Sequence, residues 1–446
     1  MNLHSVTTAP PGQEEALPGL VRELVHRFSD LWWACDTGLP ALGPAYSSRE
    51  QAAREAQLAH LQDVLIAELQ RPPQTRTEVQ ATQERIFAAI ATFARSALDL
   101  EQRHLDVLFA RGFPQAATEF AQAARRFDPQ ISGSEIFQAS RNAWVMNGLQ
   151  LLLGLPLRLT PAIFAYSLLY PYSDNYLDDP AIAEETKLAF NERFGRRLRG
   201  EAVTPTNAHE QRIFDLVGMV EGQYAPVQHP QVFASLLAIH RAQIKSVHLL
   251  RRCASPYEVD VLGISFEKGG TSVLADGYLV AGTLTPAQAE FLFGWGAFAQ
   301  LLDDLQDVEQ DGRDGLLTVF SRTARPWHST GVRAVFSRMT TPWPLDAITN
   351  RTFHFSARVM ELVDCFTAPG SEPLKELMRM AAVLPLINAA GRSGRCYTAG
   401  YLRELEAHSP FRFSFLRQSS QKLAHHRVSL MRMVEAFATI GDAPAG

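Results

Sequence analysis

The sequence has few cysteines, and their arrangement does not suggest a disulfide framework or a zinc site. Its four cysteines, Cys35, Cys253, Cys365 and Cys396, lie far apart and form no C-x-x-C pair. This usage fits a reducing compartment in which thiols serve as small core residues. We therefore expect a cytoplasmic protein.

The sequence also lacks an excess of positive charge and a long uninterrupted hydrophobic run. The net charge of -5 gives no electrostatic footprint for nucleic acid. The first fifteen residues, MNLHSVTTAPPGQEE, have no basic start followed by an apolar core, so we expect no signal peptide. The most apolar region, 143–171, is interrupted by polar residues and prolines, whereas a membrane-spanning helix needs about 20 predominantly apolar residues. This region predicts two buried helices and no transmembrane segment.

Strand signals are scarce, because no alternating Val/Ile/Thr run is bounded by hairpin turns. Helix signals are abundant: Ser47-x-x-Glu50 and Ser132-x-x-Glu135 are typical of capping boxes. Apolar residues recur at near-helical spacing from 82 to 110. The sequence therefore predicts an all-α protein.

One early linker is indicated at 71–77, RPPQTRT, where paired prolines interrupt the preceding helix. We predict a helical N-terminal extension and linker over 1–76 and one large helical domain over 77–446. Further loops are expected around 324–331 and 368–373.

Two segments share a parallel construction. LTPAIFAYSLLYPYSDNYLDD begins at Leu159, and LTPAQAEFLFGWGAFAQLLDDLQD begins at Leu284. In each, the threonine is suited to cap a helix and the proline occupies the first helical position, where its missing N–H has no cost. Each segment then runs through apolar residues into clustered aspartates.

The second aspartate cluster lies in the stretch 301–311, LLDDLQDVEQD, which contains five acidic residues and no lysine or arginine. Asp303, Asp307 and Asp311 are four residues apart and so share one helix face, with Asp304 beside them. Like charges at this spacing destabilise a helix by roughly 0.2–0.5 kcal/mol per pair, and the glycines at 312 and 315 place the negative end of the helix dipole nearby.

The first cluster, SDNYLDDP, has Asp174 and Asp178 four residues apart, with Asp179 adjacent. Pro171 just before it either kinks the helix or begins a new one. Such oxygen ligands suit Mg²⁺, which typically joins one or two carboxylates to substrate phosphates. A solvated acidic helix face is the competing interpretation, but two clusters that both emerge from apolar helices favour metal binding. The spacing of an EF-hand and the paired histidines of a zinc site are both missing.

With these motifs in this order, 132–320 resembles the isoprenoid synthase superfamily. The similarity lies in DNYLD, in the glycine-rich EKGGTSVLADGYLVAG at 267–282, and in DDLQD. The D-x-x-x-D form of the first motif is closer to the squalene and phytoene synthase branch, and to bacterial terpene cyclases resembling tetraprenyl-curcumene synthase, than to chain-elongating synthases. The N-S-E type motif of the commonest terpene cyclases does not follow Asp303.

The resemblance implies an isoprenoid synthase helical bundle around a central apolar pocket and a Mg²⁺-dependent class I terpene synthase. Such an enzyme ionises an allylic prenyl diphosphate (C20 or longer), cyclises the carbocation and releases diphosphate. Asp174, Asp178, Asp303 and Asp307 are the implied catalytic metal ligands. Asp179, Asp304 and Asp311 are further metal candidates.

The resemblance also suggests residues that would contact the substrate. For the diphosphate these are Lys268, Arg313, His240, Gln243 and Lys245. Aromatic rings stabilise carbocations, and those nearest the motifs are Phe266, Tyr278, Trp295 and Phe298. A polar helix face and ordinary core packing are the alternative roles for these two sets. The glycines at 294 and 296 suggest either close helix packing or room for a prenyl chain.

Two other functions remain open from the sequence. A prenyltransferase of the same fold, coupling two chains head to head or extending one, would use the same ionising apparatus. A non-catalytic helical partner subunit would have little reason to keep both acidic motifs. A homodimer and peripheral contact with a membrane are both compatible with the sequence.

Overall fold

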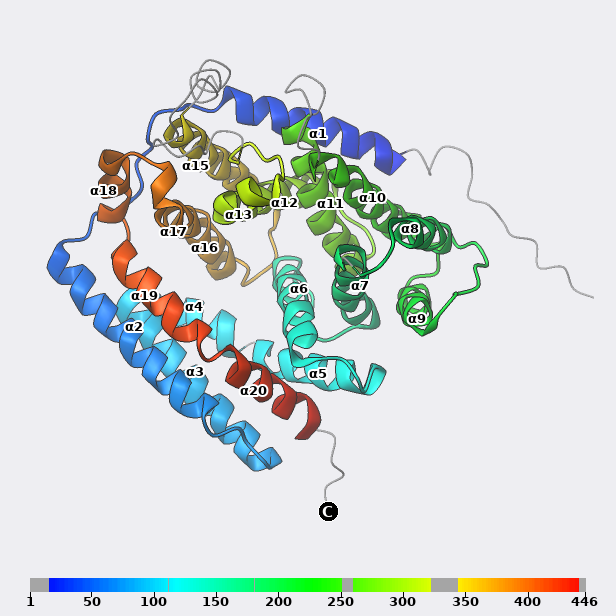
Figure 1. Cartoon of the computed structure of the whole chain (residues 1–446), viewed down its shortest axis with the longest axis horizontal. Helices are drawn as coiled ribbons and strands as arrows, with labels where there is room; N and C mark the ends of the chain where they lie inside the picture. Colours follow the sequence, from blue (N-terminus) through cyan, green and yellow to red (C-terminus); the bar gives the residue numbers. More distant parts are fainter. Residues whose placement is uncertain (1–15, 111, 180, 251–259, 322–343, 441–446) are drawn as a thin grey trace, which may run out of the picture.

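The computed structural model describes residues 16–110, 112–179, 181–250, 260–321 and 344–440. Within these ranges the chain is helical and contains no strand, which confirms the all-α prediction (Figure 1). No helix of the described part is long and apolar enough to cross a membrane. The first half of the chain contains α1 (Ala16–Ala34), α2 (Ser48–Leu69), α3 (Arg76–Leu98), α4 (Gln102–Leu105), the π-helix η1 (Asp106–Ala110), α5 (Phe113–Phe127), α6 (Gly133–Leu152), α7 (Pro161–Asp178), α8 (Glu184–Leu198) and α9 (Ala208–Gln223).

The second half continues in the same all-helical manner. It contains α10 (Pro230–Ser246), η2 (Val247–Leu250), α11 (Val261–Ala281), α12 (Pro286–Gln306), α13 (Val308–Asp314), α15 (Leu345–Glu361), η3 (Leu362–Cys365), α16 (Glu372–Ala381), α17 (Leu384–Arg392), η4 (Gly394–Cys396), α18 (Ala399–Ala407), α19 (Phe413–Ala424) and α20 (Arg427–Ile440).

The predicted helix starts are confirmed at the level of single hydrogen bonds. Ser47 and Ser132 both form complete capping boxes, at the starts of α2 and α6. Thr160 and Thr285 cap α7 and α12, each followed by a proline at the first helical position. The region 143–171 is divided between α6 and α7, as predicted, because the backbone between Leu152 and Pro161 is not helical.

A central bundle of α6, α7, α10, α11 and α12 holds the largest part of the hydrophobic core. α11 and α12 pack along each other more extensively than any other pair of described helices. Gly296 of α12 lies directly against the backbone of α11, and Gly294 lies against the ring of Phe28 from α1. The glycines in this motif therefore serve close packing of helices.

The N-terminal helices lie on opposite sides of this bundle (Figure 1). α1 packs against α10, α11, α12 and α15, and its Phe28 and Trp32 belong to the main core. α2 packs against α3 and, far along the sequence, against α19. Buried Glu55 of α2 forms an ion pair with Arg412 at the start of α19. The domain boundary at 76/77 stays a prediction.

Three local predictions need adjustment. The periodic segment 82–110 is not one helix, because Asp99 adopts the left-handed conformation (φ 55°) and ends α3. The acidic segment 301–311 is divided at Asp307 between α12 and α13, and α13 ends at Gly315 (φ 78°). Pro171 lies inside α7, which continues through it to Asp178. The loop predicted at 324–331 falls outside the described residues.

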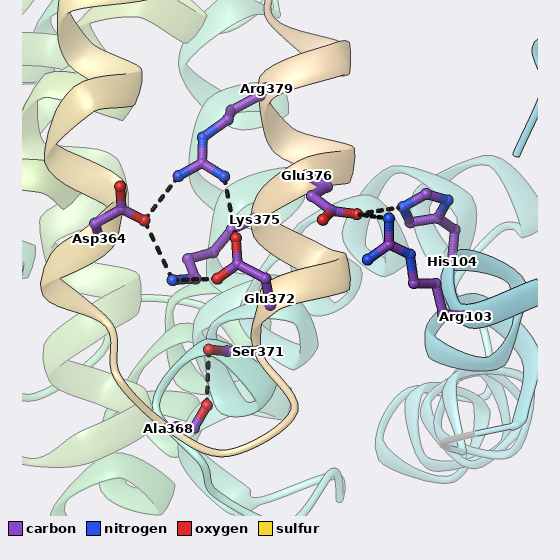
Figure 2. A network of polar contacts seen from close by, with 9 residues as sticks. All are labelled: Arg103, His104, Asp364, Ala368, Ser371, Glu372, Lys375, Glu376 and Arg379. Carbon is purple, nitrogen blue, oxygen red and sulfur yellow. Dashed lines mark hydrogen bonds and ion pairs between the residues drawn. The ribbon is translucent and has the colours of Figure 1, made fainter. Parts of the chain in front are cut away.

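A polar network fixes α16 in the structure (Figure 2). On one side, Lys375 and Arg379 form ion pairs with Asp364 of η3. On the other side, Glu376 contacts His104 and Arg103 of α4. The network thus connects a C-terminal helix to the loop region between α3 and α5.

Candidate active site: an acidic cluster beside an apolar cavity

The acidic cluster of the second motif lies where α12 ends and α13 begins. Desolvation, followed by the neighbouring Asp307 carboxylate, raises the pKa of Asp303. The side chains of Asp303 and Asp307 are nevertheless accessible to solvent. Two negative charges on consecutive helical turns, both reachable from solvent, can bind a cation.

The other two carboxylates of this cluster are buried. Asp304 accepts hydrogen bonds from Gln300 Nε2 (2.7 Å) and from Ser265 Oγ (3.3 Å), so both of its oxygens are engaged by protein groups. Burial raises the pKa of Asp304 to about 7. Burial and the neighbouring carboxylates also raise the pKa of Asp311 to about 7. These two residues are therefore less available to a metal than Asp303 and Asp307.

The first cluster lies at the end of α7. Asp174 is half-buried and accepts hydrogen bonds from Gln243 Nε2 of α10 (3.1 Å) and from Ser173 Oγ (3.4 Å). Asp179 is exposed and accepts a hydrogen bond from the Ala181 backbone N–H (2.8 Å). Asp178 is the last residue of α7, and its side chain lies outside the described part of the structure. Gln243, predicted to lie near phosphates, is thus positioned beside a carboxylate of the first motif.

Contacts across α10 and α11 place the two clusters at the same end of the bundle. Asp174 of α7 contacts Gln243 of α10, and two residues further along α10 the Lys245 ammonium pairs with Glu267 of α11 (2.5 Å). The next residue of α11, Lys268, interacts electrostatically with Asp303 and Asp304 on α12, whose pKa values burial nevertheless raises. Together with the hydrogen bond from Ser265 of α11 to Asp304, these contacts bring the two clusters to the same end of α10, α11 and α12.

The residues predicted to contact the diphosphate differ in their burial and in the protein groups that already bind them. Lys268 is half-buried beside the acidic cluster, whereas Lys245 is held by Glu267. Arg313 is exposed on α13 and donates a hydrogen bond to Gln310 Oε1 (2.7 Å). His240 is buried, its Nε2 lies 3.1 Å from the Asn191 carbonyl oxygen, and burial lowers its pKa to about 4. His240 is therefore uncharged near neutral pH, and Lys268 is the best-placed cation of this set.

A small second cavity of about 50 Å³ lies beside Asp174, between α6, α7, α8, α10 and α11. Its polar wall includes Ser173, Gln243 and Asn142. The Asn142 amide donates a hydrogen bond to Asp276 Oδ1 (3.2 Å), and complete burial raises the pKa of Asp276 well above its ordinary value. The volume suffices for ordered water, so this chamber can hydrate the polar groups behind the first motif.

A large cavity in the described part of the structure has a volume of about 750 Å³ and is almost entirely apolar. Ligand pockets in proteins typically measure about 300–1,000 Å³ and have mainly hydrophobic walls. Its walls come from α3, η1, α5, α6, α12, α16 and α20. The lining residues are Gln83, Ile86, Phe87, Leu108, Phe113, Pro114, Ala117, Thr118, Ala121, Ile136, Phe137, Ser140, Arg141, Trp144, Val145, Gly148, Leu149, Leu152, Trp295, Leu374, Met378, Val434 and Phe437.

The predicted aromatic residues divide between this cavity and the core. Trp295 lines the cavity and packs against Phe298 (ring centroids 5.4 Å apart). Phe298 itself is buried, and Phe266 stacks on Phe355 at 5.3 Å. Tyr278 is also a core residue. Of the four, Trp295 is placed to contact a ligand in the cavity.

Arg141 is the residue that the sequence analysis missed. It is exposed on α6 and is the one charged side chain that lines the large cavity in the described structure. Its positive charge also interacts with Asp303, whose pKa is raised mainly by burial. Arg141 is therefore a residue of the cavity wall that lies within electrostatic reach of the acidic cluster. Its position in a sequence segment without any acidic motif gave no signal of this role.

The donor set of the acidic ends fits Mg²⁺ bound jointly with a substrate. Among the described residues, no group of three or more Asp, Glu, His or Cys side chains is arranged to hold a metal by itself. Mg²⁺ usually keeps several waters and takes only one or two carboxylates, with substrate phosphate oxygens completing its ligands. Accessible Asp303 and Asp307, with Asp174 at the same end of the bundle, are the residues that fit this arrangement.

Comparisons of the sequence with protein-family models and with curated proteins find no match.

Proposed function

We propose that this protein is a Mg²⁺-dependent terpene synthase. Its substrate is an allylic prenyl diphosphate (C20 or longer), and its products are a cyclised hydrocarbon and diphosphate. The observation that carries the proposal is the position of Arg141, which lines a large apolar cavity and interacts electrostatically with Asp303 of the acidic cluster. A prenyl diphosphate has the same division into a long apolar chain and a compact anionic head.

The aspartates, the two basic residues and the apolar cavity have separate roles in this proposal. Asp303, Asp307 and Asp174 hold Mg²⁺, which supplies Lewis-acid stabilisation of the leaving diphosphate. Arg141 and Lys268 bind diphosphate oxygens, and an arginine fork is suited to two of them at once. The apolar cavity holds the prenyl chain away from water, and the face of Trp295 stabilises positive charge on it.

The test is Mg²⁺-dependent diphosphate release from the purified protein. Prenyl diphosphates of increasing length are supplied singly and in pairs, and the products are extracted for mass spectrometry. A cyclic hydrocarbon from one substrate, lost in Asp303→Asn and retained in the surface variant Asp30→Asn, supports the cyclase. Release only when two prenyl substrates are present identifies a prenyltransferase.

A third outcome rejects enzymatic activity. No release with any substrate, together with no effect of Mg²⁺ and inorganic diphosphate on the melting temperature, leaves the acidic cluster as surface charge and favours the non-catalytic subunit.

A further inference from the structure

Helix α16 forms one wall of the large cavity and is held by ion pairs in addition to a limited apolar contact. Leu374 and Met378, one turn apart, line the cavity. Yet the one residue of α16 that is buried is Lys375. Leu374 and Met378 are partly buried and pack against the main core, so the hydrophobic anchoring of this ten-residue helix is limited to one face.

Ion pairs on both flanks compensate for this (Figure 2). Lys375 Nζ lies 3.2 Å from Asp364 Oδ1 and 2.6 Å from Glu372 Oε2. On the opposite flank, Glu376 Oε2 lies 2.7 Å from His104 Nε2 and 3.1 Å from Arg103 Nη2. The Glu101 backbone N–H donates to His104 Nδ1 (3.1 Å), so His104 carries its proton on Nε2 and donates it to Glu376.

The element that Glu376 binds is itself part of the cavity wall. α4 leads directly into the π-helix η1, whose Leu108 lines the cavity. π-helical turns are rare and occur frequently at functional sites. Val107 of η1 packs in a small cluster with Phe113 and Leu151 that is separate from the main core, and Leu374 packs against this cluster. The walls formed by α16 and η1 therefore share a small apolar cluster and the contacts of Glu376, while Leu374 and Met378 also touch the main core.

We propose that α16 and α4–η1 form a flap that opens to admit an apolar chain and closes over it. The contacts of Glu376 with His104 and Arg103 are its latch. Opening separates Leu374 and Met378 from Leu108, and closing excludes water from the cavity. The proposal rests on the proposed function in one respect, namely that the ligand of this cavity is a prenyl chain.

The test measures how fast a neutral apolar dye, N-phenyl-1-naphthylamine, enters the cavity of the whole protein in a stopped-flow fluorimeter. Glu376→Gln weakens both latch contacts, and we expect dye association to accelerate about tenfold, because contacts to a charged group are lost. High salt should accelerate association to the wild-type protein in the same direction. The matched control is Glu201→Gln, which removes a carboxylate that likewise has two basic partners, in this case Arg196 and Arg199, away from the cavity.

A second variant protects the test from misfolding. Arg103 is half-exposed, so Arg103→Gln removes one latch contact with little effect on the fold, and we expect a smaller acceleration of about threefold. Amide hydrogen exchange should accelerate in α16 and η1 of both variants and not in α11. Dye association that is equal in the wild-type protein, both latch variants and the control would overturn the flap, as would a failure of the dye to bind at all.

Diphosphate release in the same samples separates the two proposals. Release by the wild-type protein without any change of dye kinetics in the variants rejects the flap alone. Faster dye association in the variants without release from any prenyl diphosphate retains the flap and rejects the proposed function.

Discussion

Gly269 and Gly296 face each other where α11 crosses α12. A Cβ atom added to Gly296 would lie 2.1 Å from the Gly269 carbonyl oxygen, and one added to Gly269 would lie 2.3 Å from the Gly296 carbonyl oxygen. Real Cβ atoms do not approach backbone this closely, so either side chain would force the helices apart. The same crossing sets the position of Lys268 relative to Asp303.

Gly296→Ala should therefore destabilise the protein by about 3 kcal/mol or more, because the overpacked atoms are backbone and cannot rotate away. Gly222→Ala is the matched control: it lies in α9 with open space around the added atom, and should stabilise by up to ~1 kcal/mol. Urea unfolding of the two variants measures both effects. Equal stability of the two variants would contradict the close crossing.

The stability of the metal-free protein should fall as pH rises from about 4 to 7. The pKa of Asp304 and that of Asp311 are raised to about 7 in the folded protein, above the ordinary value, so the folded state binds more protons in this range. Asp311→Asn removes one such group and should stabilise the protein at pH 8 by about 1–3 kcal/mol, with little effect at pH 4. Urea unfolding at both pH values measures this, with Asp30→Asn as the surface control. A stabilisation that is equal at both pH values would disprove the assignment.

The aspartates of the second motif should not be equivalent. Asp303→Asn and Asp307→Asn should each reduce Mg²⁺-dependent diphosphate release by about 100-fold or more, because each removes an accessible metal ligand. Asp304→Asn should reduce it less, since both of its oxygens are occupied by Gln300 and Ser265. Steady-state rates of diphosphate release, measured over a range of Mg²⁺ concentrations, rank the three variants. A larger loss of diphosphate release in Asp304→Asn than in Asp303→Asn would contradict the assignment of Asp303 as the metal ligand.

Arg141→Gln should lower kcat/KM for a prenyl diphosphate by about 10- to 100-fold, since charge-assisted hydrogen bonds to the diphosphate are lost. Arg141→Lys keeps the positive charge but loses the forked guanidinium. Its kcat/KM should therefore lie between that of Arg141→Gln and that of the wild-type protein. Calorimetric titration with inorganic diphosphate and Mg²⁺ provides a readout independent of turnover. Unchanged diphosphate affinity in Arg141→Gln would exclude this residue from the site.

Gly148→Leu should shift the preference toward shorter prenyl diphosphates by about tenfold. Gly148 lines the cavity, and an added Cβ meets no atom within 4 Å, so the new side chain occupies space otherwise open to ligand. Leucine is also the better helix former, so the fold should tolerate it. Competition between a shorter and a longer prenyl diphosphate measures the ratio of their kcat/KM values. Gly222→Leu, in α9, is the control, and an equal ratio in both would place the chain outside this cavity.

Local signals in the sequence were sufficient for the helix starts, because a capping box or a Thr-Pro pair is completed within four residues. They also located the aspartates of both motifs. The resemblance ranked Asp303 above Asp304, but no local signal predicted that Asp304 is buried and hydrogen-bonded to Ser265, which α11 supplies from another part of the chain. Nor did local signals predict the end of α3 at Asp99, whose left-handed backbone is uncommon for a residue other than glycine.

Arg141 could not be predicted for a similar reason. Its importance comes from a cavity whose walls are assembled from distant segments, and no spacing in the sequence records that assembly. The domain boundary, the metal and the substrate remain predictions that the experiments above address.

The pairing of α2 with α19 has a consequence for how this protein is made. Glu55 contacts Arg412 across 357 positions of sequence, and Gln62 contacts Ser419 across the same separation. Val434 and Phe437 of α20 complete the wall of a cavity that begins with residues of α3. A nascent chain on the ribosome therefore exposes the apolar lining until its last helices emerge, and such long loops close slowly. The surface that would bind a ligand in the finished protein is, during synthesis, the one at greatest risk of aggregation.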